Sequence, residues 1–207
     1  MSSNLITATK LEMISNKDKF IFIHIPKCGG TSIERFVLSH YGISNDWTRL
    51  YPLEVLPMKV RSEFSIGFGR QQHMSLSNFS LEKQEEYFSF AFVRNPWDRI
   101  MSSYLYSKRL GHKFTFKSFF DSIEFENHCK PQSYFLNKNI DFIGRFETLQ
   151  EDFNLVCGKL GLEPKQLPHE NKTVHKHYTE WYTDENKKLV QDKYSEDIET
   201  FNYKFGS

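Results

Sequence analysis

The sequence predicts an α/β fold, a single domain in which helices flank a mainly parallel β-sheet. Its 207 residues are a usual length for one domain. Short, nearly continuous apolar runs alternate along the chain with apolar residues at helical spacing. Such runs are typical of strands covered on both faces, and the alternation is typical of a parallel sheet with crossover helices. No internal repeat, low-complexity tract or Pro/Gly-rich linker divides the chain.

The composition excludes several classes of protein. Hydrophobic residues make up 39% of the chain and aromatic residues 16%, which is enough core material to exclude a disordered protein. Lysine and arginine total 27 against 26 acidic residues, and the net charge of +1 argues against a dedicated nucleic-acid or membrane-surface binder. The three cysteines form no CxxC pair and fit neither a disulfide scaffold nor a zinc ribbon.

The beginning of the chain carries no targeting signal that we recognise. Residues 1–17 are polar and weakly patterned, so we expect a flexible lead-in there and the folded domain over 18–207. No run approaches the roughly 18 apolar residues of a membrane span. We therefore expect a cytoplasmic protein if the chain is full length, and a lumenal (Golgi) one if it was trimmed from a membrane anchor.

The first half of the chain contains two predicted strands and one helix. A buried strand over 20–25 ends at the glycine-containing segment 26–30. A helix should begin at Thr31, because Thr31 and Glu34 have the spacing of a capping box. A second strand is predicted over 64–68 from its alternating phenylalanine and isoleucine residues.

The second half begins with the strongest helix prediction. A buried strand over 88–93 precedes Asn95, which can cap the next helix, and Pro96, which suits its first position. Apolar residues then recur with helical period until Gly111. The remaining elements are a helix around 116–122, a strand around 140–143, a helix from a Thr148/Glu151 capping box to Gly161, a polar loop over 164–183, a helix over about 185–194 and an aromatic tail that packs down.

The clearest chemical signal is the sequence FIFIHIPKCGGTS, in which a strand turns into a helix. The two glycines let backbone N–H groups point inward, and the helix adds its unpaired N–H groups and the positive end of its dipole. With Lys27 and the hydroxyls of Thr31 and Ser32, this predicts a cradle for phosphate or sulfate. It is not a Walker A loop, because Lys27 precedes the glycines. The alternative is an ordinary tight turn.

The second signal is FVRNPWDR, which continues to Ser102, Ser103 and Tyr104. Arg94 follows a buried strand, at the sheet edge where open α/β folds bind ligands, and its planar guanidinium suits a phosphate. Ser102 lies off the apolar stripe of the helix and could face the same anion. The alternative is an ion-paired arginine and an ordinary surface serine.

Together, IPKCGGTS and FVRNPWDRIMSSY resemble the two nucleotide-binding motifs of sulfotransferases, most closely the carbohydrate (Golgi-type, family 2-like) enzymes. The resemblance implies a P-loop-NTPase-like sulfotransferase fold and 3′-phosphoadenosine 5′-phosphosulfate (PAPS) as co-substrate, with the nucleotide product PAP and no metal. By position it assigns the 5′-phosphosulfate to Lys27, Cys28, Gly29, Gly30, Thr31 and Ser32, and the 3′-phosphate to Arg94 and Ser102. Cys28 departs from the small hydroxyl residue more usual there.

The chemistry that the resemblance implies needs a cation and a base. Lys27 would neutralise the charge that develops on the bridging oxygen, and a histidine would take the proton of the acceptor hydroxyl. His73 is the candidate base, because it lies between the two motifs and near a strand end, whereas His24 is expected in the core. The loop around 169–178 is expected to close over the nucleotide, with Lys176 or His175 touching phosphate.

The implied partners are PAPS and a hydroxylated acceptor, a sugar or glycan by the resemblance. No nucleic acid and no membrane span are expected, and the oligomeric state is left open. A nucleotide-dependent phosphotransferase is a rival interpretation, but it predicts a lysine after the glycines and acidic magnesium ligands. A non-catalytic nucleotide-binding scaffold is a second rival.

Overall fold

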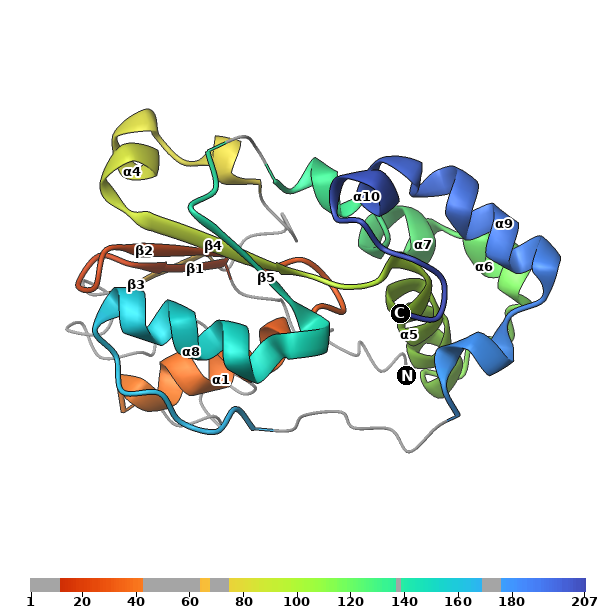
Figure 1. Cartoon of the computed structure of the whole chain (residues 1–207), viewed down its shortest axis with the longest axis horizontal. Helices are drawn as coiled ribbons and strands as arrows, with labels where there is room; N and C mark the ends of the chain where they lie inside the picture. The colour runs from red at the N-terminus through yellow and green to blue at the C-terminus, as the bar shows by residue number, and fades with distance from the viewer. Residues whose placement is uncertain (1–11, 43–63, 68–74, 137–138, 169–175) are drawn as a thin grey trace, which may run out of the picture.

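The sheet is built as the sequence predicts, with one additional strand. The computed structural model describes residues 12–42, 64–67, 75–136, 139–168 and 176–207, and its strands lie in the order β3-β1-β2-β4-β5 (Figure 1). β2, β4 and β5 pair in parallel, while β1 is antiparallel to both β2 and β3, so four of the five strands run in one direction. The strands are β1 Glu12–Ser15, β2 Phe20–Ile23, β3 Phe64–Gly67, β4 Phe88–Val93 and β5 Phe142–Arg145.

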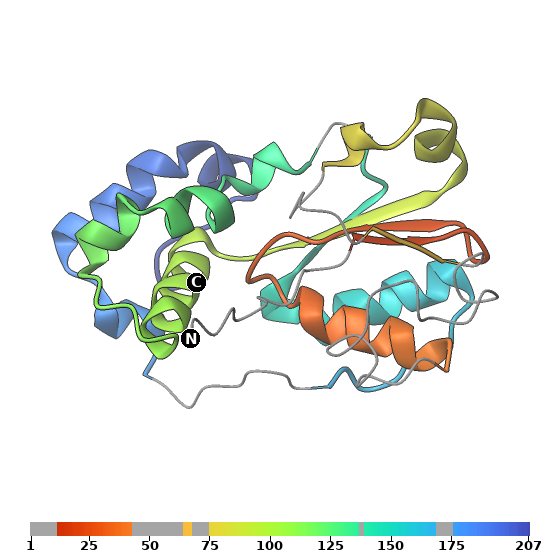
Figure 2. The same ribbon diagram turned by 180° about the vertical axis from the view of Figure 1, so that it is seen from behind.

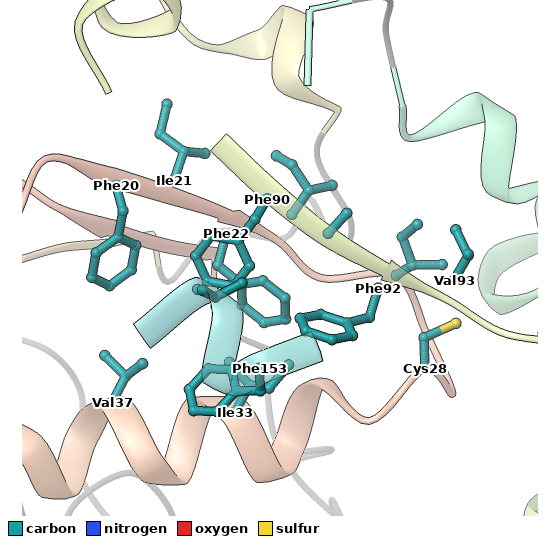
Figure 3. Packing of buried hydrophobic residues seen from close by; sticks show 14 of the residues in the cluster. Phe20, Ile21, Phe22, Cys28, Ile33, Val37, Phe90, Phe92, Val93 and Phe153 are labelled. Carbon is teal, nitrogen blue, oxygen red and sulfur yellow. The ribbon is translucent and has the colours of Figure 1, made fainter. Parts of the chain in front are cut away.

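Two helices, α1 (Gly30–His40) and α8 (Leu149–Leu160), lie side by side under one face of the sheet in both ribbon views (Figures 1 and 2). Phenylalanines of β2 and β4 point toward these helices (Figure 3). The rings of Phe22 and Phe90 stack with their centroids 5.0 Å apart. Ile21 is fully buried on the other face, which explains why the strand is apolar at every position.

A second, aromatic cluster lies beyond the carboxyl ends of the strands, where α5 (Pro96–Arg109) leaves the sheet (Figure 1). The tail joins this cluster as expected, because the ring of Phe205 meets that of Trp97 edge-on at 5.7 Å. None of the described helices is long and apolar enough to cross a bilayer. The other helices are α4 Leu81–Glu86, α6 Phe116–Phe120, α7 Ile123–His128, α9 Asp184–Lys193 and α10 Ser195–Thr200, with 3-10 turns η2 Leu76–Asn78, η3 Gln132–Tyr134, η4 Phe146–Thr148 and η5 Tyr178–Trp181.

Two expectations about element boundaries are wrong. β1 lies inside the segment 1–17, where the sequence predicts a flexible lead-in, and its Ile14 is buried in the core. The strand is missed because its sequence, EMIS, has only two apolar residues and they are adjacent, so it shows neither alternation nor a continuous apolar run. β5 begins two residues after the expected start at 140.

Both predicted capping boxes are also absent. α1 begins one residue early, with Gly29 as its N-cap and no side-chain cap, while Glu34 bonds to His24 instead. At α8 the hydroxyl of Thr148 donates to Asp152 rather than capping the helix. Glu34 thus pairs with a residue of the preceding strand end, and Thr148 with a different residue of its own helix, in place of the pairing that the spacing suggests.

Candidate active site

The turn between β2 and α1 leaves a row of backbone N–H groups open. The N–H groups of Gly29, Gly30 and Thr31 have no acceptor among the described residues. The first bonded N–H groups are those of Ser32 and Ile33, which both donate to the carbonyl of Gly29, at 3.0 and 3.4 Å. No acidic residue lies in the first turn of the helix. The positive end of the α1 dipole is therefore available to an anion.

Neither glycine of this turn can be replaced by a larger residue without a steric conflict. Gly29 has φ +82°, in the left-handed region, and a Cβ there would lie 2.7 Å from Cδ2 of Leu149. A Cβ on Gly30 would lie 2.5 Å from Nε2 of His24. The His24 ring cannot easily yield, since it is buried and its Nδ1 lies 2.5 Å from a carboxylate oxygen of Glu34. His24 is therefore the core residue that the sequence predicts.

Lys27 adopts an unusual backbone conformation that two arginines hold in place. Its φ is +68°, which for a residue with a side chain costs on the order of 1–3 kcal/mol. Nη1 of Arg94 donates to the carbonyl of Lys27 at 2.9 Å, and Nε of Arg99 donates to the carbonyl of Pro26 at 2.9 Å. Two successive carbonyls of the turn are thus bound to guanidinium groups of the β4–α5 region.

Arg94 lies at the end of β4 and is almost completely buried, with 8% of its surface exposed. Its Nε and Nη2 each lie 2.8 Å from Oδ2 of Asp98, and its guanidinium stacks on the Phe146 ring at 4.0 Å. Arg94 is therefore ion-paired, as the alternative interpretation expects. Two of its five N–H donors have no partner among the described residues, so its predicted contact with a phosphate stays open. Ser102 is half-buried on α5.

The thiol of Cys28 faces the protein interior. It is buried and donates to the carbonyl of Pro26 (3.6 Å) and to Oε1 of Gln132 (3.4 Å). Burial raises the pKa of this thiol to about 12, although Arg99 and Arg94 act in the opposite direction. The backbone N–H of Cys28 bonds to the carbonyl of Ile25 at 3.4 Å. The N–H and the thiol of Cys28 both have acceptors inside the protein, and its predicted contact with the 5′-phosphosulfate stays a prediction.

The structure adds three residues that the sequence did not single out. Arg99 is 1% exposed and also donates to the carbonyls of Lys130 (2.9 Å) and His128 (3.4 Å). A charged residue among the buried positions of a helix is a signal that could have identified it. The carboxamide of Gln132 binds both the N–H (2.8 Å) and the carbonyl (3.0 Å) of Arg94. Asp197 accepts the N–H of Gln132 at 2.7 Å.

For two predicted site residues, His73 and Lys176, the structure describes no contact with the turn. His73, like His175, lies outside the described residues, so its role as the base stays a prediction. Lys176 is exposed, and the contact described for it is an ion pair with Glu180, with Nζ 3.8 Å from the carboxylate. No group of three or more metal-ligating side chains occurs within the described ranges.

The chain was compared with known protein families, sequences and solved structures. The family model described as "Sulfotransferase family" matches residues 12–204, a range that contains both turns. An uncharacterized protein of Archaeoglobus fulgidus is 37% identical over 89 residues, which cover 39% of this chain and 72% of that protein. The crystal structure of a sulfotransferase from Alicyclobacillus acidocaldarius covers 90% of this chain and 96% of its own, with 15% identity and a TM-score of 0.43.

Proposed function

Because the chain belongs to the sulfotransferase family, we propose that it transfers the sulfuryl group of PAPS, by in-line attack, to a hydroxyl of a carbohydrate acceptor. The observation that carries this proposal is the row of open N–H groups at Gly29, Gly30 and Thr31. An N-terminus without a capping side chain or an acidic residue suits the 5′-phosphosulfate of such a donor.

A second anionic group fits the neighbouring turn. Nη1 of Arg94 reaches the carbonyl of Lys27 at 2.9 Å, so the two turns are in direct contact. A donor with a 5′-phosphosulfate and a 3′-phosphate could therefore bind both, the latter through the remaining donors of Arg94 and the hydroxyl of Ser102. PAPS supplies the sulfuryl group when bound, and the nucleotide leaves as 3′,5′-ADP (PAP).

The residues of the candidate site then have the following roles in the transfer. The ammonium of Lys27 neutralises the charge that develops on the bridging oxygen, and the N–H groups of the turn stabilise the equatorial oxygens. His73 is the proposed base that accepts the proton of the acceptor hydroxyl.

Nucleotide binding tests the donor. Calorimetry should show tighter binding of 3′,5′-ADP than of ATP, and a preference for ATP would favour the rival phosphotransferase. Labelled sulfate should then pass from PAPS to at least one member of a panel of sugars and phenols. Tight binding of 3′,5′-ADP without transfer to any acceptor would favour the non-catalytic scaffold, and transfer to phenols alone would reject a carbohydrate acceptor.

A pair of glycine variants tests the open N–H groups. Gly30→Ala should weaken binding of 3′,5′-ADP by roughly tenfold or more, because the new Cβ collides with the fixed His24 ring and displaces the backbone donors. Gly158→Ala is the matched control, since a Cβ there meets nothing within 4 Å. If both variants bound 3′,5′-ADP with equal affinity, the turn would not be part of the nucleotide-binding site.

A further inference from the structure

The side chain of Lys27 lies against an aromatic ring of α5. Its Nζ is 4.4 Å from the centroid of Tyr106, well inside the distance of about 6 Å at which a cation interacts with a ring face. Tyr106 follows Ser102 by one helical turn and is 43% exposed. The guanidinium carbon of Arg109 lies 5.0 Å from the same ring. Tyr106 therefore occupies a polar surface beside the turn rather than the core.

The segment that leads into and forms the first part of α5 also holds the main chain of Pro26 and Lys27. Arg99, on α5, bonds to the carbonyl of Pro26, and Arg94, which precedes α5, bonds to that of Lys27. With the backbone fixed, the remaining freedom of Lys27 is in the torsions of its long side chain. The ring contact restricts those torsions at the far end.

We propose that Tyr106 is a positioning residue for sulfuryl transfer, whose ring holds the ammonium of Lys27 charged and in place against α5. This inference rests on the role of Lys27 in the proposed function. A ring face attracts the ammonium but not the neutral amine, so the contact also favours the protonated state. An ammonium that is already restricted loses less rotamer freedom when it meets the developing charge.

Amine labelling tests the contact without requiring activity. The donor-free protein is treated with a limiting amount of an N-hydroxysuccinimide ester, and acylation of each lysine is followed by peptide mass spectrometry. Tyr106→Leu should speed the acylation of Lys27 about two- to fivefold, because the neutral amine that reacts is more populated. Tyr106→Phe retains the ring and should label like the unmodified protein. An unchanged rate at Lys27 in Tyr106→Leu would overturn the proposal.

The molecule contains a matched control pair. Nζ of Lys130 lies 4.1 Å from the ring of Tyr134, which is 55% exposed. Tyr134→Leu should speed the labelling of Lys130 but not of Lys27, and Tyr106→Leu should do the reverse. If Tyr106→Leu sped both lysines equally, the cause would be general loosening of the structure, and the proposal would fail.

Kinetics test the consequence for transfer. Tyr106→Leu should lower kcat about two- to fivefold and leave the dissociation constant of 3′,5′-ADP unchanged, while Tyr106→Phe should restore kcat. A loss of nucleotide affinity without a change in kcat would contradict a positioning role. If the unmodified protein transferred no sulfuryl group, the proposed function would fail, whereas the labelling experiment would still decide whether Tyr106 holds Lys27.

Discussion

The turn after β2 and the turn after β4 both lead from a buried parallel strand into a helix at the same edge of the sheet, yet the two helices begin differently. The N-cap of α1 is Gly29, so the helix has no side-chain cap, and no acidic residue lies in its first turn. The N-cap of α5 is Asn95, whose carboxamide oxygen accepts the N–H of Trp97, and Asp98 lies in the first turn of the helix. The first N-terminus is open and attracts anions, whereas the second is capped and carries a carboxylate.

The second turn also makes more hydrogen bonds to distant parts of the chain. Asn95 is fully buried, its N–H bonds to Glu147 at 2.7 Å, and its carboxamide nitrogen bonds to the carbonyl of Lys204 at 2.8 Å. The first turn is held in its left-handed conformation by donors that come from the second. The first turn thus has unbonded backbone N–H groups, and the second turn and its helix supply the arginine side chains that hold it.

Removing the Arg99 side chain, which supports the first turn, should give the largest loss in the free energy of unfolding. Arg99→Met deletes the donors to the carbonyls of Pro26, Lys130 and His128; the bond to Pro26 is buried and the other two are partly buried. We expect a loss of about 3–5 kcal/mol in the free energy of unfolding, measured in urea, because buried acceptors lose charged partners. Arg109→Met, at the exposed end of α5, should change the free energy by less than about 0.5 kcal/mol. Similar values for both variants would mean that α5 does not hold the first turn.

Lys27→Ala should affect chemistry far more than binding. Turnover should fall about 10²–10³-fold, as for other groups that stabilise charge in the transition state, with the affinity for 3′,5′-ADP within about threefold of the original. Lys27→Gly should lose as much turnover but melt at a higher temperature than Lys27→Ala, since glycine adopts φ +68° without strain. A parallel loss of affinity and turnover in Lys27→Ala would place Lys27 in ground-state binding.

Asn95→Ala should lower the free energy of unfolding, because Asn95 is the N-cap of α5. It removes the bond to Trp97 and the donor to the carbonyl of Lys204, so we expect a loss of about 1–2 kcal/mol in thermal or urea unfolding. The exposed cap Thr115, which accepts the N–H of Ser118 at 3.1 Å, is the comparison, and Thr115→Ala should cost less. The reverse ranking would show that burial adds nothing to the Asn95 cap.

Cys28→Ser should have the smallest effect at neutral pH, with turnover within about twofold, because a serine hydroxyl can still donate to Gln132. Burial raises the pKa of the folded thiol to about 12, above its ordinary value of 9.0. The stability that Cys28 contributes is therefore present below pH 9 and is lost as the pH rises toward 12. Urea unfolding at pH 7 and pH 10 should show a smaller decrease for Cys28→Ser than for the unmodified protein.

Local patterns predict the elements in which apolar residues recur regularly. β2 and β4 lie in continuous apolar runs, β3 has alternating apolar residues, and α5 has a helical apolar period. β1 could not be predicted, because its four residues form a strand only through their pairing with β2 and β3.

The same distinction holds for the site. The glycines and Lys27 could be predicted because the turn that they form is contiguous in sequence. Gln132 could not, since it meets the backbone of Arg94 across 38 residues, and no spacing rule joins the two. The capping box at Thr31 failed for a related reason, because a distant histidine is a better partner for Glu34.

The bond from Asn95 to the carbonyl of Lys204 spans 109 residues, and that to the carbonyl of Ser207 spans 112. At the usual pace of translation, about 5–20 residues per second, roughly 5–20 s separate the synthesis of Asn95 from that of its partners. During that interval the nascent chain carries the strand and helix around Asn95 without the segment that closes over them. The second turn can therefore be completed only after residues 204–207 have been synthesised, long after the strand and the helix that it joins.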